Sequence, residues 1–111
     1  MNDDFYKVLS KAMDKIEKDG MRAIYILNPD VELKAQYLYS EFITSNMKAR
    51  IEYSPAYMQI TVIAETRLLD TSTNNLKQKL LSADVVCIDA LSNGILHIEC
   101  MFNNAFRKVG I

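Results

Sequence analysis

The chain contains few of the residues that interrupt regular structure. Its 111 residues include three glycines, two prolines and no tryptophan. This composition excludes long flexible linkers and low-complexity tracts, which are rich in glycine, proline and serine. A chain of this length can bury roughly 65% of its unfolded surface around one core. We therefore expect a single domain over residues 1–111.

The chain also lacks an excess of charge of either sign and any long apolar run. Thirteen basic and fourteen acidic residues give a net charge of −1, so no global field attracts nucleic acid or an anionic membrane. A membrane-spanning helix needs about 20 apolar residues, and the longest runs here are only a few. Because Met1–Asp4 is acidic, unlike the start of a signal peptide, we expect a cytoplasmic protein with no membrane partner.

Common catalytic and cofactor motifs are absent as well. The sequence has no glycine-rich phosphate loop, no CxxC pair, no G-x-S-x-G and no HExxH. We therefore expect no cofactor, and the motif content favours a non-enzymatic protein.

What the sequence does contain is clear periodicity, which predicts three helices and five strands. The helices are expected at about 4–18, 29–44 and 74–83, and the strands at 22–27, 49–53, 58–64, 85–91 and 95–102. Asn28-Pro29-Asp30 is a strong helix start, because the cap, the proline and the acidic residue each suit the unpaired amides of a first turn. The second helix is expected to turn its apolar residues inward, namely Val31, Ala35, Leu38, Phe42 and Ile43.

Two hairpin registers follow from keeping apolar side chains on one face. A four-residue loop over 54–57 pairs Tyr53 with Met58. A three-residue turn over 92–94, with Gly94 in the left-handed conformation, pairs Leu91 with Ile95. The second register puts Cys87 and Cys100 on opposite faces, so these cysteines are expected to be free thiols.

The order of elements suggests a fold. The step from Arg22 to Ala49 and the step from Met58 to Val85 are both 27 residues, and each contains one helix. This pattern predicts a ferredoxin-like βαββαβ plait, an α+β fold, with an extra N-terminal helix and an extra C-terminal edge strand. The expected spatial order of the strands is 49–53, 58–64, 22–27, 85–91 and 95–102.

The last predicted hairpin gathers the reactive side chains. Its register places Asp89 opposite His97 and Cys87 opposite Glu99, all on the face away from the core. His97 is the chain's only histidine, so histidine chemistry would have to use it. Alternating polar residues are also what solvent exposure alone produces on a hairpin, and we expect neither a catalytic residue nor a metal site here.

The same outer face is expected to be unusually apolar. Its candidate binding residues are Tyr25, Ile63, Val85 and Met101, together with Asp89, His97 and Glu99. A patch of this kind should be covered by the first helix, by a second copy or by another protein. The expected function is thus a small protein-interaction module that self-associates as a homodimer.

Two other functions remain open at this point. One is a small-ligand or metal-dependent enzyme that uses the face formed by Asp89, His97 and Glu99. The other is weak nucleic-acid binding, which is disfavoured because strand 58–64 carries no aromatic residue on the face of Thr61 and Ile63.

Overall fold

A computed structural model describes residues 7, 10–11, 14, 23–67 and 78–110. Within these residues the protein is an α+β fold with two sheets. Its elements are β1 (Ala23–Leu27), α2 (Pro29–Thr44), β2 (Lys48–Ser54), η1 (Pro55–Tyr57), β3 (Gln59–Arg67), β4 (Val85–Ala90), β5 (Ile95–Phe102) and β6 (Phe106–Gly110). No helix in this described part is long and apolar enough to cross a membrane.

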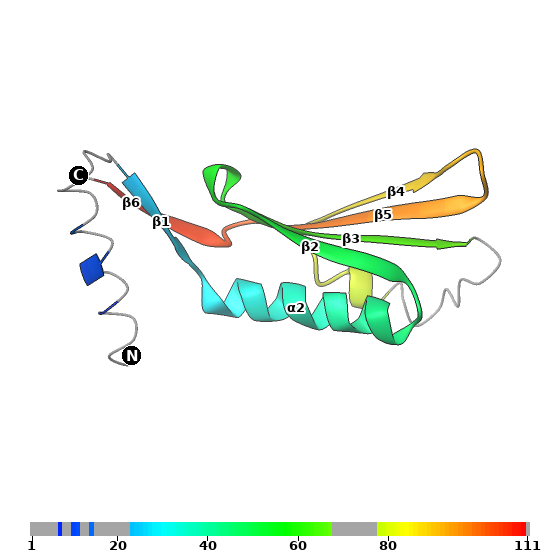
Figure 1. Ribbon diagram of the computed structural model, residues 1–111, viewed down its shortest axis with the longest axis horizontal. Coiled ribbons are helices and arrows are strands. Elements are labelled where there is room, and N and C mark those ends of the chain that lie inside the picture. The colour runs from blue at the N-terminus through cyan, green and yellow to red at the C-terminus, as the bar shows by residue number, and fades with distance from the viewer. Residues whose placement is uncertain (1–6, 8–9, 12–13, 15–22, 68–77, 111) are drawn as a thin grey trace.

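The larger sheet has four strands in the order β2-β3-β5-β4, and all its neighbours are antiparallel. Helix α2 runs along one face of this sheet and contacts β2 and β3 (Figure 1). The other two strands, β1 and β6, form a separate antiparallel ribbon that extends beyond the end of the sheet (Figure 1).

The predicted strand order is therefore wrong, and a ferredoxin-like plait is not confirmed. β1 is not the central strand, because β3 pairs directly with β5 over eight residue pairs, from Ile60–Phe102 to Arg67–Ile95. A strand has only two edges, and those of β3 are occupied by β2 and β5. β5 is consequently an inner strand, and the edge position expected for it belongs to β4.

Strand β1 is apolar, but it does not take a central position in the larger sheet. It pairs with β6, a strand that the sequence pattern did not predict, in a register from Ala23–Gly110 to Leu27–Phe106. Because α2 leads from this ribbon into the edge strand β2, it does not connect two neighbouring parallel strands. The crossover rule that suggested the plait applies only to such parallel connections.

Helix α2 begins and ends as expected. The side chain of Asn28 accepts a hydrogen bond from the backbone N–H of Asp30 at 3.1 Å, and Pro29 occupies the first turn. Ala35, Leu38 and Phe42 are fully buried against the sheet. Ile43 was expected to face inward but is about half exposed, because it lies one position beyond the i, i+3, i+7 stripe.

The β4–β5 hairpin confirms its predicted register, with Asp89 opposite His97 and Cys87 opposite Glu99. Gly94 adopts a φ of 79°, and the N–H of Leu91 donates to the carbonyl of Ile95 at 2.8 Å.

The β2–β3 hairpin differs from its prediction by two residues. Tyr53 pairs with Ile60 rather than with Met58. Met58 closes the turn in the left-handed conformation, with a φ of 55°, and therefore cannot continue the strand. Because side chains in a strand alternate with a period of two, this shift leaves every side chain on its predicted face.

The core lies between α2 and the sheet. Its largest fully buried side chains are Leu38, Phe42, Ile60, Val62, Ile98, Cys100 and Phe102. The strand residues among them are even-numbered and share one face of β3 and β5, as alternation requires. Burial against a helix explains why this face is continuous in apolar residues.

A compact junction joins the ribbon to the sheet. The N–H of Ala105 donates to the carbonyl of Met58 at 2.9 Å, and the carbonyl of Ala105 accepts from the N–H of Asn28 at 2.7 Å. Asn104, just before it, has a φ of 56°. Ala105 is fully buried. The junction thus holds together β6, the start of α2 and the β2–β3 turn.

Two predicted helices lie partly or wholly outside the described residues. The first, at about 4–18, is described only at isolated positions and stays a prediction. Of the third, only residues 78–83 are described; Gln78–Leu80 is helical, and Lys79 is paired with Glu41 of α2.

Candidate functional site

The face of the four-stranded sheet opposite α2 is called the outer face below. Two rows of side chains cross all four strands there, Lys48–Glu65–His97–Asp89 and Arg50–Ile63–Glu99–Cys87. A third row contains Glu52, Thr61, Met101 and Val85. The charged groups are not mixed evenly: Lys48 and Arg50 lie on β2, whereas the charged residues of β4 and β5 on this face are all acidic apart from His97.

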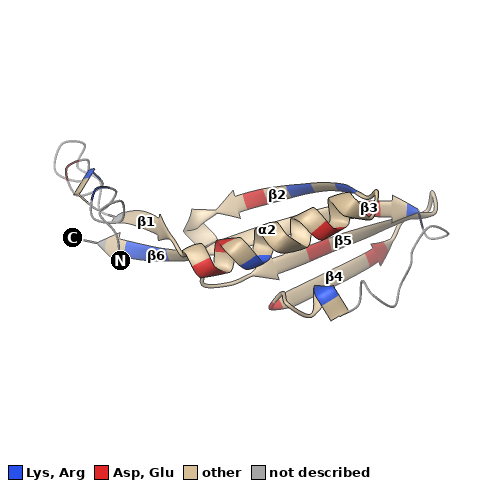
Figure 2. Cartoon of the chain, turned by 90° about the horizontal axis from the view of Figure 1, so that it is seen from below, with Lys and Arg blue, Asp and Glu red and all other residues tan. Residues whose placement is uncertain are grey.

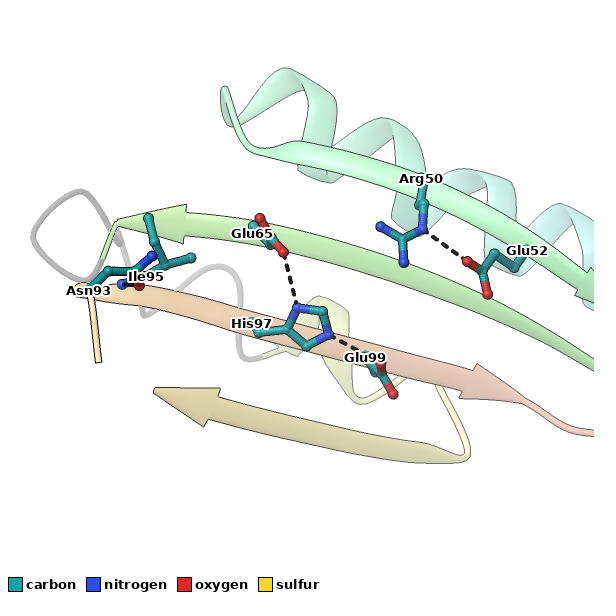
Figure 3. A network of polar contacts seen from close by, with 7 residues as sticks. All are labelled: Arg50, Glu52, Glu65, Asn93, Ile95, His97 and Glu99. Atoms are coloured by element: carbon teal, nitrogen blue, oxygen red, sulfur yellow. Dashed lines mark hydrogen bonds and ion pairs between the residues drawn. The ribbon is translucent and has the colours of Figure 1, made fainter. Parts of the chain in front are cut away.

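His97 lies between two carboxylates on this face. Its Nδ1 is 3.3 Å from an Oε1 of Glu65 on β3, and its Nε2 is 3.1 Å from an Oε1 of Glu99 on β5 (Figure 3). A neutral imidazole has one donor and one acceptor nitrogen, whereas the protonated ring donates from both. Since a carboxylate can only accept, the observed geometry suits the protonated ring.

The electrostatic environment agrees with this geometry. The hydrogen bond that His97 donates to Glu99 is the largest cause that raises the pKa of His97 above its usual 6.5; partial burial opposes it, and the hydrogen bond to Glu65 adds to it. A raised pKa means that the bridge stabilises the fold fully below about pH 6.5 and that this contribution is lost as the pH rises through the folded-state pKa.

Most of the predicted site residues share this one face. Val85, Asp89, His97, Glu99 and Met101 are brought together by the β4–β5 hairpin. Val85 and Asp89 are exposed, and the other three are half-buried.

Two predicted site residues lie elsewhere or are inaccessible. Tyr25 is in the β1–β6 ribbon, opposite Lys108, and not on the outer face. Ile63 is on the outer face but only 5% exposed, because its neighbours across the strands are Arg50 and Glu99, whose long side chains lie beside it.

Glu65, which contacts His97 on this face, was missing from the predicted site. Glu65 lies in β3, which extends to Arg67, whereas the predicted strand ends at residue 64. Continuing the period-two pattern of residues 59–63 would have placed Glu65 on the outer face.

For metal binding, the described residues contain no group of three or more histidine, cysteine, aspartate or glutamate side chains arranged to hold an ion. His97 instead makes ion pairs with both neighbouring glutamates. What the outer face offers chemically is therefore a titratable bridge.

The two thiols differ strongly in accessibility. Both cysteines are free, with Cys87 exposed and Cys100 buried, as their opposite faces predicted. Burial raises the pKa of the Cys100 thiol to about 12. Because the thiolate is the reactive form, Cys100 should be inert in the folded protein.

We expect one thiol to react quickly with Ellman's reagent at pH 8 in dilute native protein, and the second only after denaturant is added. Cys87→Ser should remove the fast phase and leave the slow one. Two thiols reacting at equal rates in the native protein would contradict the assigned faces.

Strand β4 forms an open edge of the sheet. It pairs with β5 alone among the described strands. Antiparallel pairs alternate between hydrogen-bonded and non-bonded positions. Since Leu91 bonds to Ile95, the odd-numbered residues of β4 are the ones bonded to β5. The N–H and C=O groups of Val86, Ile88 and Ala90 therefore point away from the sheet.

The side chains around this edge are also apolar and uncovered. Figure 2 shows α2 lying over the middle of the sheet, with β4 outside its cover. Ile88, although on the α2 side of the sheet, is 50% exposed. Leu81, in the turn before β4, is 79% exposed. This accessible apolar surface was not predicted, because the sequence argument placed β4 between two other strands.

A scan against protein-family models finds no match to this chain, and neither do searches of curated proteins and of solved structures.

Proposed function

We propose that the protein is a non-enzymatic protein-interaction module that self-associates by pairing β4 with β4 of a second copy. The single observation that carries this proposal is the open β4 edge. Unpaired N–H and C=O groups along an apolar strand are a template for a further strand. Pairing there would satisfy the backbone groups of Val86, Ile88 and Ala90.

The opposite edge of the sheet is protected in a way that β4 is not. β2 carries Lys48, Arg50 and Glu52 on its outer face, and charged side chains on an edge strand oppose strand addition. β4 reads Val-Val-Cys-Ile-Asp-Ala, with one charged residue and no proline or glycine. The contrast is visible in Figure 2, where basic residues colour β2 and none colours β4. Strand addition is therefore directed to one side of the sheet.

Apolar side chains next to β4 would enlarge the interface. Leu33 and Tyr37, one turn apart on α2, are both exposed and line a groove of about 270 Å³ with Lys34 and Ser82. Leu81 is beside this groove in the chain. A second copy that adds its β4 to this edge would place its own helix or turn over these residues. Burial of such a surface is favourable at about 25 cal/mol per Å².

A second copy fits this edge because β4 is complementary to itself. Antiparallel pairing about a two-fold axis at Ile88 sets Val86 against Ala90 of the other copy, and Val85 against Leu91. Cys87 then faces Asp89, so no two carboxylates are directly opposed. The axis is perpendicular to the sheet, and both α2 helices lie on the same side of a continuous eight-stranded sheet.

A proline at position 88 tests this edge, because it should disrupt the proposed interface and leave the β4–β5 pairing intact. Ile88→Pro removes an N–H that points away from β5, so the β4–β5 hairpin keeps its hydrogen bonds. Ile88→Lys keeps the N–H but adds an edge charge. We expect the wild type to be dimeric by sedimentation equilibrium at about 100 μM, where even a Kd near 10 μM leaves most chains paired. Both variants should be monomeric.

The matched control is Tyr57→Lys, which adds the same charge at an exposed aromatic residue between β2 and β3. It should remain dimeric. Far-UV circular dichroism checks that each variant is folded. A monomeric wild type at this concentration rejects self-association, and a dimeric Ile88→Lys places the interface elsewhere than at β4.

A further inference from the structure

The β4–β5 hairpin has one cationic group that titrates near neutral pH. Between Lys79 and Arg107 the sequence contains no lysine or arginine, and His97 is its only histidine. The acidic residues of the same stretch are Asp84, Asp89 and Glu99. The charge of the hairpin in this range of pH is therefore set by His97.

The groups that face His97 come from each neighbouring strand. Glu65 on β3 and Glu99 on β5 contact its two ring nitrogens, and Asp89 is its partner across β4. Lys48 on β2 stands beyond Glu65 at the far end of the same row, and Arg67 on β3 lies on the same face two residues from Glu65. Helix α2 is on the other face of the sheet and contributes no charge to this cluster (Figure 1). His97 thus neutralises carboxylates that no nearby basic side chain of β4 or β5 can neutralise.

We propose that protonation of His97 controls the pairing of β4 with a second copy, so that the protein associates more tightly as the pH falls. This inference rests on the proposed function and names the regulation of the same edge.

The physical cause is repulsion between the two hairpins at the β4 seam. With His97 neutral, the stretch that forms the hairpin contains no cation to balance Asp84, Asp89 and Glu99, and pairing brings these carboxylates toward the same three groups of the other copy. One ring nitrogen then becomes an acceptor and cannot hold a carboxylate, so Glu65 or Glu99 is released. With His97 protonated, both glutamates are held and each hairpin has one negative charge fewer. Like charges close together at an interface oppose association, and they do so less in high salt.

Proton linkage gives the sign and the size of the effect. Because pairing brings further carboxylates toward each of the two histidines and so favours their protonated form, the Kd at pH 6 should be about tenfold lower than at pH 8. Because the hydrogen bonds to Glu99 and Glu65 raise the pKa of His97 above 6.5, the ring stays protonated to higher pH than a free imidazole does. The dependence should weaken in high salt.

The experiment measures the Kd by sedimentation equilibrium from pH 6 to pH 8, in reducing buffer, and follows the His97 imidazole resonance by NMR over the same range. His97→Gln keeps a hydrogen-bonding side chain but does not titrate, and it should make the Kd independent of pH. Glu99→Gln should move the NMR midpoint and the association midpoint to lower pH together.

Glu52→Gln is the matched control, because it removes a carboxylate from the same face at the distant edge strand. It should leave the pH dependence unchanged. A Kd that is equal at both pH values, or a pH dependence that survives in His97→Gln, overturns this inference alone. Absence of a dimer at every pH overturns the proposed function as well.

Discussion

Phe42→Ala is expected to lower the free energy of unfolding by about 3–5 kcal/mol, the usual cost of removing a buried phenylalanine. Phe42 is fully buried on α2 and belongs to the same core cluster as Ile60, Val62 and Phe102. The loss combines the transfer free energy of the ring with a cavity that the surrounding strands cannot close, because β3 and β5 are held in register over eight pairs.

Urea denaturation at a fixed protein concentration measures this change, since association would otherwise add to the apparent stability. The control is Tyr57→Ala, which removes an aromatic ring that is 78% exposed, and a change below about 0.5 kcal/mol is expected. If Phe42→Ala cost no more than this control, α2 could not be packed on the sheet as described.

Ala105→Pro is expected to cost about 2–5 kcal/mol and to disconnect the ribbon from the sheet. Proline removes the N–H that donates to the carbonyl of Met58, and the loss of such a hydrogen bond costs about 0.5–1.5 kcal/mol. Proline also pushes the residue before it toward an extended backbone. Asn104 is in the left-handed region, with a φ of 56°, so its backbone would be strained.

Asn104→Gly is the matched control. Glycine adopts a positive φ readily, and the carbonyl of Asn104 that accepts from the Asn28 side chain is retained. This variant should therefore unfold at nearly the wild-type urea concentration. Hydrogen exchange should show early opening of Ile24–Ile26 in Ala105→Pro alone. Equal protection of β1 in both variants would show that the junction does not hold the ribbon.

Local structure was predictable wherever neighbouring residues decide it. The start of α2 at Asn28-Pro29 and the left-handed Gly94 follow from caps and turns of a few residues. The opposition of Asp89 to His97 follows from the same turn. The β2–β3 register was wrong by two residues, because nothing in the loop sequence revealed that Met58 would adopt a left-handed backbone.

For the candidate site, the sequence predicted which residues of one hairpin share a face. It did not predict which residues of other elements lie next to them. That His97, Glu99 and Asp89 share one face follows from period-two alternation. That Glu65 contacts His97 depends on β3 pairing with β5, and these strands are separated by a long stretch of chain. The exposure of Ile88 likewise depends on the tertiary structure, because α2 does not extend over β4.

By itself, the sequence determined α2, the strand character of β1 to β5, the turn at Gly94 and the apolar face of β2 to β5, because capping, turn conformation and alternation act between residues close in the chain. Only the tertiary structure decided which strands are neighbours. Strand β1 is apolar on both faces. This property suits a central strand and a strand of a ribbon paired with β6 equally well. Which of these two positions β1 takes depends on the edge of β3 that β2 leaves free. All eight residues of β5 pair with β3 along that edge, so β1 cannot bind there. That choice leaves β4 at the edge, and with it the surface on which the proposed function depends.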